Sequence, residues 1–235
     1  MRLITIDNGN SNPHVGLFED KELIKVIPLK DYIEQKDDFI IMSDVGPPLQ
    51  IKPSYSLKKH RHTNELPSFF EMPVHYSETL GDDRLIWGYA LFQKIQNDND
   101  RILAIDAGTF MTMDLITSQG FMGGFIFPGL KTFLTSYAKG SLLPDLSENK
   151  IQPFQLPQTT NQAILSATDH FLESTLASMI CKLKPSQIFV TGGSMEIVYN
   201  KLLELNLGVQ LERDPHSIHL ALALIFQSQL QREAF

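Results

Sequence analysis

The sequence is poor in cysteine, since Cys181 is the one thiol among 235 residues. A single thiol excludes an intrachain disulfide, a CxxC redox pair and a cysteine-rich zinc site, and it favours a reducing compartment. Long apolar runs are also missing, because no stretch approaches roughly 18 uninterrupted apolar residues. The N-terminus lacks the basic, apolar and small-residue pattern of a signal sequence. These absences predict a cytoplasmic protein with no membrane partner.

Positive charge is the minority charge of this chain. There are 20 Lys+Arg against 27 Asp+Glu, which gives a net charge of −7, and the acidic excess is spread over both halves. Neither half has the basic patch that nucleic acid or an anionic membrane attracts, so we expect no nucleic-acid partner. The apolar fraction of 43% and the length suffice for one or two buried cores, which excludes a disordered or fibrous chain.

One pattern, a strand followed by a polar turn and a second strand, occurs twice. Leu3–Asp7 leads into Asn8–Ser11 before a strand-like segment resumes at Val15. About half a chain later, Arg101–Asp106 leads into Ala107–Thr109 in the same way, so that IDNGNS is matched by IDAGTF. A repeat at this spacing predicts two similar domains, residues 1–99 and 100–235, each opening with the same hairpin.

Helical periodicity alternates with these strands. Apolar spacing predicts helices after Asp83, from Thr160 as N-cap toward Lys184, and over residues 195–205 and 217–231, with a strand over 186–191. Cys181 lies within the second of these helices, which predicts a core position. Residues 44–76 are rich in Pro, His and Ser and predict irregular structure with short strands. Strands that alternate with helices place the chain in the α/β class.

The two polar turns, Asp7–Ser11 and Asp106–Thr109, each follow a strand that ends in an aspartate. Their glycines allow a close backbone approach to phosphate, their exposed N–H groups can donate to its oxygens, and the carboxylate can hold hydrated Mg²⁺. One such turn alone is better explained as an ordinary hairpin turn. The duplication favours a pair of loops that grip the two ends of a polyphosphate.

Three further motifs admit both a structural and a functional interpretation. In Gly81-Asp82-Asp83-Arg84 an aspartate either caps the predicted helix or acts as a general base, with Arg84 pairing an anion. Gly123–Gly129 and Thr191–Ser194 either serve packing or leave room for a flat purine or ribose. His60 and His62 are expected to be solvated surface residues rather than metal ligands.

In order along the chain, the motifs are DNGNSNPHVG, GDDR, DAGTFMT, GGFIFPG, TTNQAILSA and VTGGS. This set resembles type III pantothenate kinase, of the actin, sugar-kinase and heat-shock ATPase superfamily, over nearly the whole chain. The resemblance implies ATP-dependent phosphorylation of pantothenate to 4′-phosphopantothenate, the first step of coenzyme A synthesis. It also implies an α/β fold of two ribonuclease-H-like domains with mixed sheets flanked by helices, an active site in the interdomain cleft, and a homodimer.

The resemblance assigns the nucleotide side of the site and its ions. It implies that Asp7 lies near Mg²⁺ and the phosphates of ATP, and that Asp106 binds the monovalent cation, K⁺ or NH₄⁺, that this family requires. The residues that it implies for nucleotide and phosphate binding are Gly9, Asn10 and Ser11 in the first loop, Gly108 and Thr109 in the second, and Gly192 and Gly193. Ser11 replaces the commoner threonine and keeps the hydroxyl.

The resemblance also assigns the acceptor side. It implies that Asp83 is the base on the pantothenate hydroxyl and that the substrate ligands are Tyr76, Gly81, Arg84 and, from the partner subunit, Thr160. Val74 stands where the family usually has a tyrosine, so Tyr76 is displaced by two positions, and Ala167 replaces a common glycine. Two alternatives remain open at this point: a non-catalytic regulatory protein of the same fold, and a superfamily enzyme acting on another small substrate, such as a sugar kinase or a polyphosphate phosphatase.

Overall fold

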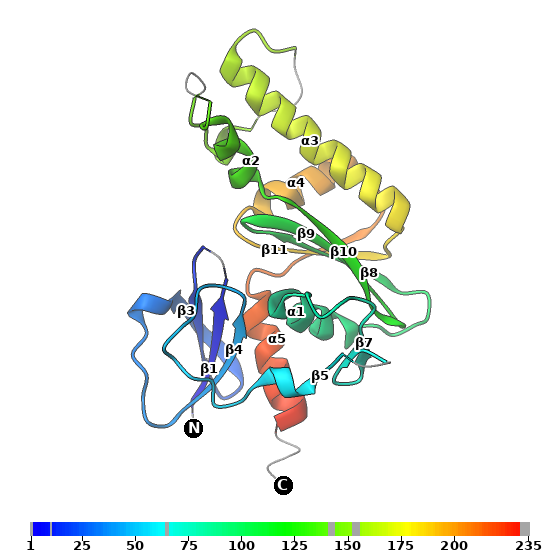
Figure 1. Cartoon of the computed structure of the whole chain (residues 1–235). Helices are drawn as coiled ribbons and strands as arrows, with labels where there is room; N and C mark the ends of the chain where they lie inside the picture. Colours follow the sequence, from blue (N-terminus) through cyan, green and yellow to red (C-terminus); the bar gives the residue numbers. More distant parts are fainter. Residues whose placement is uncertain (1, 10, 64–65, 141–143, 152–155, 231–235) are drawn as a thin grey trace. The chain divides into compact units, whose positions relative to one another are not determined.

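The computed structural model describes residues 2–9, 11–63, 66–140, 144–151 and 156–230. The chain forms two compact units (Figure 1). The first consists of Met1–Asp98, Ile116–Gly123 and His216–Phe235, and the second of Asn99–Leu115 and Gly124–Pro215. The division into domains 1–99 and 100–235 remains a prediction from the sequence repeat, while the first compact unit also includes the last segment of the chain.

The first unit contains a four-stranded sheet with the order β3-β2-β1-β4. Its strands are β1 (Arg2–Asn8), β2 (His14–Glu19), β3 (Glu22–Pro28) and β4 (Asp38–Asp44). β1 runs antiparallel to β2 and parallel to β4, and Asp7 is aligned with His14 on one side and Ser43 on the other. Because side chains alternate along a strand, Ile4 and Ile6 enter a core on one face while Thr5 and Asp7 point to the other.

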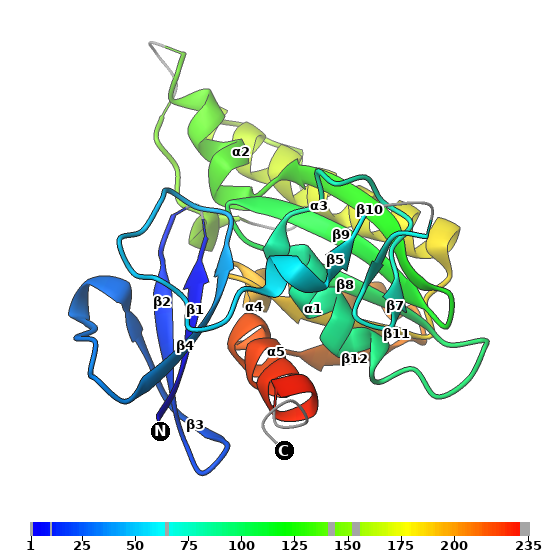
Figure 2. The same cartoon turned by 60° about the horizontal axis from the view of Figure 1, so that its bottom comes forward.

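Two helices of this unit, α1 (Asp82–Phe92) and α5 (Ser217–Ile225), pack on each other and on β4. Both views show α5 beside α1 and the strands (Figure 1, Figure 2). Oγ1 of Thr5 lies 2.8 Å from Nδ1 of His219 on α5. The neighbouring position on β2 is Gly16, where a Cβ atom would approach that nitrogen to 2.8 Å. Glycine is therefore required for α5 to reach the sheet.

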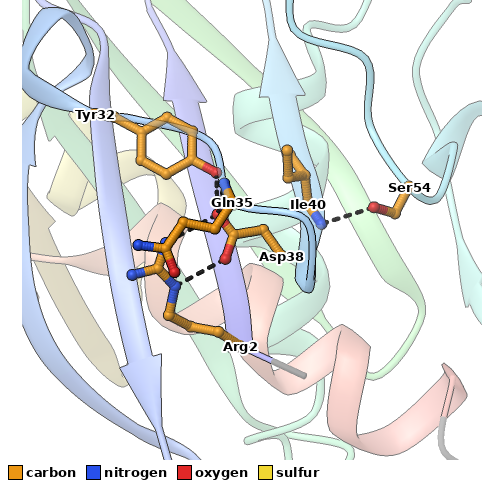
Figure 3. Close-up of polar contacts among 6 residues, drawn as sticks. All are labelled: Arg2, Tyr32, Gln35, Asp38, Ile40 and Ser54. Atoms are coloured by element: carbon orange, nitrogen blue, oxygen red, sulfur yellow. Dashed lines mark hydrogen bonds and ion pairs between the residues drawn. The ribbon is translucent and has the colours of Figure 1, made fainter.

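Polar contacts join the start of β1 to the start of β4 and to the segment that precedes β4 (Figure 3). Nε and Nη2 of Arg2 donate to the two carboxylate oxygens of Asp38 at 2.8 and 2.9 Å. The hydroxyl of Tyr32 and the amide of Gln35 donate to Asp38 Oδ2 at 2.7 and 2.9 Å. The amide of Ile40, on the same strand as Asp38, donates to Oγ of Ser54 at 2.9 Å. This network lies at the opposite end of β1 from Asp7.

Between β4 and α1 the chain has short elements joined by irregular segments, as the composition predicted. They are η2 (Leu57–His60) and a small antiparallel sheet of β5 (Arg61–His62), β6 (Ser68–Phe69) and β7 (Met72–Pro73). The prediction that His60 is solvated was wrong. Its ring is half-buried and stacks on Tyr55 and Phe70, at centroid distances of 5.5 and 4.3 Å. His62 is exposed.

The second unit is built on a sheet with the order β10-β9-β8-β11-β12. Its strands are β8 (Arg101–Ala107), β9 (Phe110–Thr117), β10 (Gly120–Pro128), β11 (Gln187–Thr191) and β12 (Gln210–Arg213), and the outer parts of β9 and β10 extend into the first unit's segment Ile116–Gly123. β11 runs parallel to both β8 and β12. The carboxyl ends of β8 and β11 consequently meet at the same edge of the sheet.

Helices α2 (Leu130–Tyr137), α3 (Thr160–Leu183) and α4 (Met195–Leu205) complete the second unit, with a short turn η3 (Glu148–Lys150) before α3. Side chains of α3 and α4 share one core with β8 and β11; these are Leu172, Leu176, Ile180, Val198, Leu202, Leu103, Ile105, Ile188 and Val190. The rings of Phe133 and Phe171 stack at 4.9 Å and join α2 to α3.

Two details of α3 correct the sequence analysis. Its N-cap is Thr159, whose hydroxyl accepts from the amide of Gln162 at 3.3 Å, and Thr160 is the first helical residue. Cys181 is exposed rather than in the core. The buried side of the helix follows Leu172, Leu176 and Ile180, and the next residue is turned away from that row. Within the described ranges, none of the helices has the length and apolarity needed to span a bilayer.

Candidate active site

The first of the two turns predicted to bind phosphate follows β1 directly. Asp7 and Gly9 are described, Ser11 is exposed, and Asn10 lies outside the described residues. The segment after β4 is hydrogen-bonded to the start of this loop, because the amides of Val45 and Gly46 donate to the carbonyl of Asn8 at 3.1 and 2.7 Å. A Cβ at Gly46 would lie 2.5 Å from the carbonyl oxygen of Gly9, so only glycine allows this approach.

Asp7 and Asp83 are two aspartates held in a poorly solvated environment. Burial, with a smaller contribution from the charge of Asp83, raises the pKa of the Asp7 carboxyl to about 7. Burial also raises the pKa of Asp83, against the opposing effects of the Arg84 backbone N–H and side-chain charge. Carboxylates with perturbed pKa values are concentrated at functional sites.

The start of α1 gives the GDDR motif its geometry. The N-cap is Gly81, which has no side chain to cap the helix, and Asp83 Oδ1 accepts from the amide of Arg84 at 2.8 Å. A Cβ at Gly81 would lie 2.5 Å from that same oxygen. The capping interpretation of the motif is therefore wrong, since neither aspartate occupies the cap position. Glycine at position 81 instead makes room for the Asp83 carboxylate.

Arg84 is held against aromatic rings. Its side chain is buried, and its Cζ lies 5.1 Å from the ring centre of Tyr76 and 5.9 Å from that of Phe121. Contacts of a guanidinium with aromatic faces are attractive and limit its rotation. The structure thus brings together four of the predicted acceptor-side residues, namely Tyr76, Gly81, Asp83 and Arg84.

A pocket of about 270 Å³ opens beside Tyr76 in the same unit. Its walls include Val74 and Tyr76, the two positions at which this chain departs from the family pattern. Ser77 and Glu78, which follow Tyr76, line it as well, and so does Arg61.

In the second unit, the turns after β8 and β11 lie side by side. The parallel register aligns Asp106 with Thr191, so Gly192 follows at the level of the turn after β8. Gly192 has φ of +91°, and a Cβ there would lie 2.4 Å from Asp106 Oδ1 and 2.6 Å from the carbonyl carbon of Ala107. Gly193 has no atom of the described chain within 4 Å of its Cβ position. The two turns are therefore closely packed at Gly192 and open at Gly193.

The glycine-rich segment before α2 packs against the turn after β8. The sequence did not predict which segment Gly129 contacts. Gly129 is the N-cap of α2, and its amide donates to the carbonyl of Thr109 at 3.1 Å. A Cβ at Gly129 would lie 2.1 Å from the carbonyl oxygen of Gly108. Thr132 Oγ1 also donates to Thr109, at 2.6 Å. The Pro-Gly pair before the helix is the sequence signal of this contact, and it favours the packing interpretation of Gly129.

The structure also shows a hydrogen bond between Ser194 and Glu148 that the sequence did not predict. Ser194 Oγ donates to Glu148 Oε2 at 2.6 Å, immediately after the Gly192-Gly193 turn. Thr160, predicted to reach a partner subunit, is exposed at the first position of α3. Its role remains a prediction.

The residues present fit a metal that is held mainly by its substrate. Among the described side chains, no group of three or more His, Cys, Asp and Glu is arranged to hold a metal ion. Burial nevertheless raises the pKa of both Asp7 and Asp83, and a cation beside them would favour their charged forms. A divalent cation that takes its other ligands from phosphates and water needs only such limited support from the protein.

A sequence profile of the type III pantothenate kinases matches residues 3–180. The chain belongs to the type III pantothenate kinase family. The family member of Aquifex aeolicus is 28% identical over 207 residues, which cover 82% of this chain and 87% of that protein. The member from Azobacteroides pseudotrichonymphae is 30% identical over 222 residues, covering 86% and 88%.

Solved structures confirm the fold predicted for a pantothenate kinase of this type. A Campylobacter jejuni protein described as a Baf family transcriptional activator superposes with a TM-score of 0.63 at 18% identity, over 97% of this chain and 99% of that one. The Clostridium difficile activator of 2-hydroxyisocaproyl-CoA dehydratase, solved with ADPNP, gives 0.54 at 10% identity, over 100% and 98%. At these identities the likeness concerns the fold alone, which is a mixed α/β fold.

Proposed function

We propose that this protein catalyses the ATP-dependent phosphorylation of pantothenate to 4′-phosphopantothenate, the first step of coenzyme A synthesis. Membership of the type III family sets the reaction class. The observation that carries the assignment to this chain is the desolvated pair Asp7 and Asp83, with Arg84 fixed beside Asp83. These are the charged groups that phosphoryl transfer to an alcohol needs.

In the proposed mechanism Asp83 accepts the proton of the pantothenate hydroxyl as that oxygen attacks the γ-phosphorus of ATP. A raised pKa makes this carboxylate a better proton acceptor than an ordinary aspartate. Arg84 offers its guanidinium to an anionic group of the acceptor. Mg²⁺, when bound with ATP, neutralises charge on the phosphates, and Asp7 is the residue proposed to hold it. The protein therefore contributes mainly positioning and charge.

The residues proposed for the nucleotide are Gly9, Asn10 and Ser11 in the first loop, Gly108 and Thr109 in the second, and Gly192 and Gly193. The open space at Gly193 supports a role beside the nucleotide. Asp106 is proposed to bind the monovalent cation, K⁺ or NH₄⁺. We further propose a homodimer in which Thr160 contacts pantothenate bound to the partner.

The deciding experiment is a coupled assay of ADP release with purified protein, Mg²⁺-ATP and pantothenate, run in K⁺ and in Na⁺. We expect turnover that depends on pantothenate and on K⁺. Asp83→Asn removes the proton acceptor at nearly constant shape, so kcat should fall on the order of a hundredfold with little change in pantothenate binding. Asp20→Asn, in the exposed turn between β2 and β3, is the matched control and should retain parental turnover.

Each result bears on a separate part of the proposal. Parental kcat in Asp83→Asn would remove Asp83 from the role of base, and equal rates in K⁺ and Na⁺ would remove the monovalent cation. Absence of pantothenate-dependent turnover in folded protein would overturn the proposal that the protein phosphorylates pantothenate. It would leave a non-catalytic regulatory protein, or a kinase for another small hydroxylated substrate, which a screen of sugar acceptors in the same assay tests.

A further inference from the structure

Arg61, at the start of β5, makes an unusual set of contacts with one short segment. Its Nη1 donates to the carbonyl of Leu80 at 2.8 Å. Its Nη2 donates to the carbonyl of Glu78 at 2.9 Å and, more weakly, to that of Ser77 at 3.3 Å. The same Nη1 lies 3.8 Å from Asp82 Oδ1. One guanidinium therefore contacts three backbone carbonyls and a carboxylate within six consecutive residues.

The segment that Arg61 contacts has little internal support. Residues 77–80 belong to neither a helix nor a strand, and their local bonds are a turn from the Leu80 amide to the Ser77 carbonyl at 3.2 Å and a 2.6 Å contact between the hydroxyls of Ser77 and Thr79. Backbone carbonyls outside regular structure require partners from elsewhere. Here a side chain some 16 to 19 positions earlier in the sequence provides them.

This segment joins the two parts of the proposed acceptor site. Tyr76 comes immediately before it, and Gly81, Asp83 and Arg84 come immediately after it. The length and path of residues 77–80 therefore set where the Tyr76 ring meets the Arg84 guanidinium, now 5.1 Å from it. They also set where α1 begins, since Asp82 is its first residue.

We infer that Arg61 is a positioning residue, which holds residues 77–80 so that Tyr76, Asp83 and Arg84 keep the arrangement needed to bind and activate the acceptor. This inference rests on the proposed function, because the acceptor-side residues are those of that reaction. Arg61 does not itself take part in proton or phosphoryl transfer. Its effect passes through the backbone that it holds, and displacements of about 1 Å at a catalytic group can cost on the order of a hundredfold in rate.

The chemistry of arginine is essential to this role. A guanidinium presents its N–H groups in a rigid planar fork and can donate to several carbonyls at once, whereas the ammonium of lysine is a compact charge on a flexible stem. Arg61→Lys keeps a positive charge for Asp82 and loses the fork. Arg61→Gln loses both the charge and most of the donors. The two variants therefore separate electrostatic attraction from the holding of the backbone.

The first readout is steady-state kinetics with both substrates varied. For Arg61→Gln we expect kcat/KM for pantothenate to fall about ten- to a hundredfold while KM for Mg²⁺-ATP stays within about twofold. Arg61→Lys should resemble Arg61→Gln, within about threefold, rather than the parent. Parental kcat/KM in Arg61→Lys would overturn the inference, because charge alone would then suffice. A matched loss for both substrates would also overturn it, by indicating general damage.

The second readout is amide hydrogen exchange without any substrate, and it does not depend on the protein being a kinase. Amides of residues 77–83 should exchange faster in both Arg61 variants than in the parent. Arg2→Gln is the matched control: it breaks an arginine–aspartate pair of the same unit, at the end of β1 opposite Asp7, and should leave both exchange at 77–83 and pantothenate kinetics unchanged.

The two readouts distinguish failure of the inference from failure of the function. Unchanged exchange in Arg61→Gln would show that Arg61 does not hold this segment. Faster exchange together with parental kinetics would show that holding it does not matter for the reaction. A parent protein without pantothenate turnover would overturn the proposed function and the positioning role with it.

Discussion

His219 is a titratable side chain within the packed part of the first unit. It is 4% exposed and contacts Thr5 at 2.8 Å, and its ring centre lies 6.5 Å from that of His14. Burial, with smaller contributions from His14 and His216, lowers the pKa of His219 to about 4. Burial likewise lowers the pKa of His14. The folded protein therefore keeps these rings neutral under conditions in which the unfolded chain binds protons.

This arrangement predicts acid lability. Between pH 6.5 and about pH 4 the unfolded state holds the extra proton, so the free energy of unfolding falls as pH decreases through that range and is fully retained above it. The loss from His219 should be about 2 kcal/mol between pH 7 and pH 5. Urea unfolding of the parent and of His219→Gln over this range measures it. The free energy of unfolding should depend less steeply on pH in the variant than in the parent. The same pH dependence in both proteins would contradict the assignment to His219.

At the scale of elements, the parallel strands β8 and β11 place the turns that follow them at one edge of the sheet of the second unit. β8 ends at Asp106 and Ala107, and β11 leads into Gly192, whose backbone packs against both. The amide of Ser194 then donates to the carbonyl of Ala107 at 2.9 Å, which joins the start of α4 to the end of β8. The position of the turn after β8 is thus fixed both by strand pairing and by the start of α4.

Gly192→Ala tests that close packing, with Gly208→Ala as its control. Both glycines have positive φ, +91° and +67°, but a Cβ at Gly208 meets no atom of the described chain within 4 Å. Gly208→Ala should cost about 1 kcal/mol of unfolding free energy from its backbone conformation alone. Gly192→Ala should cost about 3 kcal/mol, because its Cβ would also overlap Asp106 and Ala107. Equal losses in denaturant unfolding would mean that the overlap relaxes freely.

At the scale of the whole molecule, the proposed reaction draws on Asp83 in the first unit and on Thr160 in the second. If Thr160 serves the acceptor site of a partner chain, each site takes Asp83 from one chain and Thr160 from the other. Mixing the Asp83→Asn and Thr160→Ala proteins can then restore activity. A mixed dimer would contain one site with both residues intact. Complementation between two inactive variants therefore tests the proposed homodimer and the role of Thr160 together.

An equal mixture of the two variants, exchanged through reversible dissociation, should recover about a quarter of parental turnover, since half of the dimers are mixed and each has one intact site of two. Differently tagged chains show by pull-down that mixed dimers have formed. Each variant exchanged with itself is the control and should stay inactive. Mixed dimers without recovered turnover would place Thr160 outside the partner's acceptor site.

Local sequence was sufficient for much of the architecture. Apolar alternation and turn residues located β1, β2, β8, β9 and β11, and helical periodicity located α3, α4 and α5. Other elements were not foreseen: no strand was assigned to the residues of β3, β4 and β12, and no helix to those of α2. The helix predicted over 217–231 was too long, since α5 ends at Ile225. These signals extend over one element at most, so they identify elements and not their neighbours.

The candidate site divides in the same way. The ordered motifs were enough to place the chain in its family, and they marked Asp7, Asp83 and Asp106 as candidates, because each of these lies in a motif of consecutive residues. The contacts that shape the site join residues far apart in the chain, such as Gly46 with Gly9 and Arg61 with Leu80. Their partners are set by strand pairing and helix packing, which no local pattern contains. The sequence by itself therefore determined the chemistry available to this protein, and tertiary structure decided which backbone segments hold that chemistry in place.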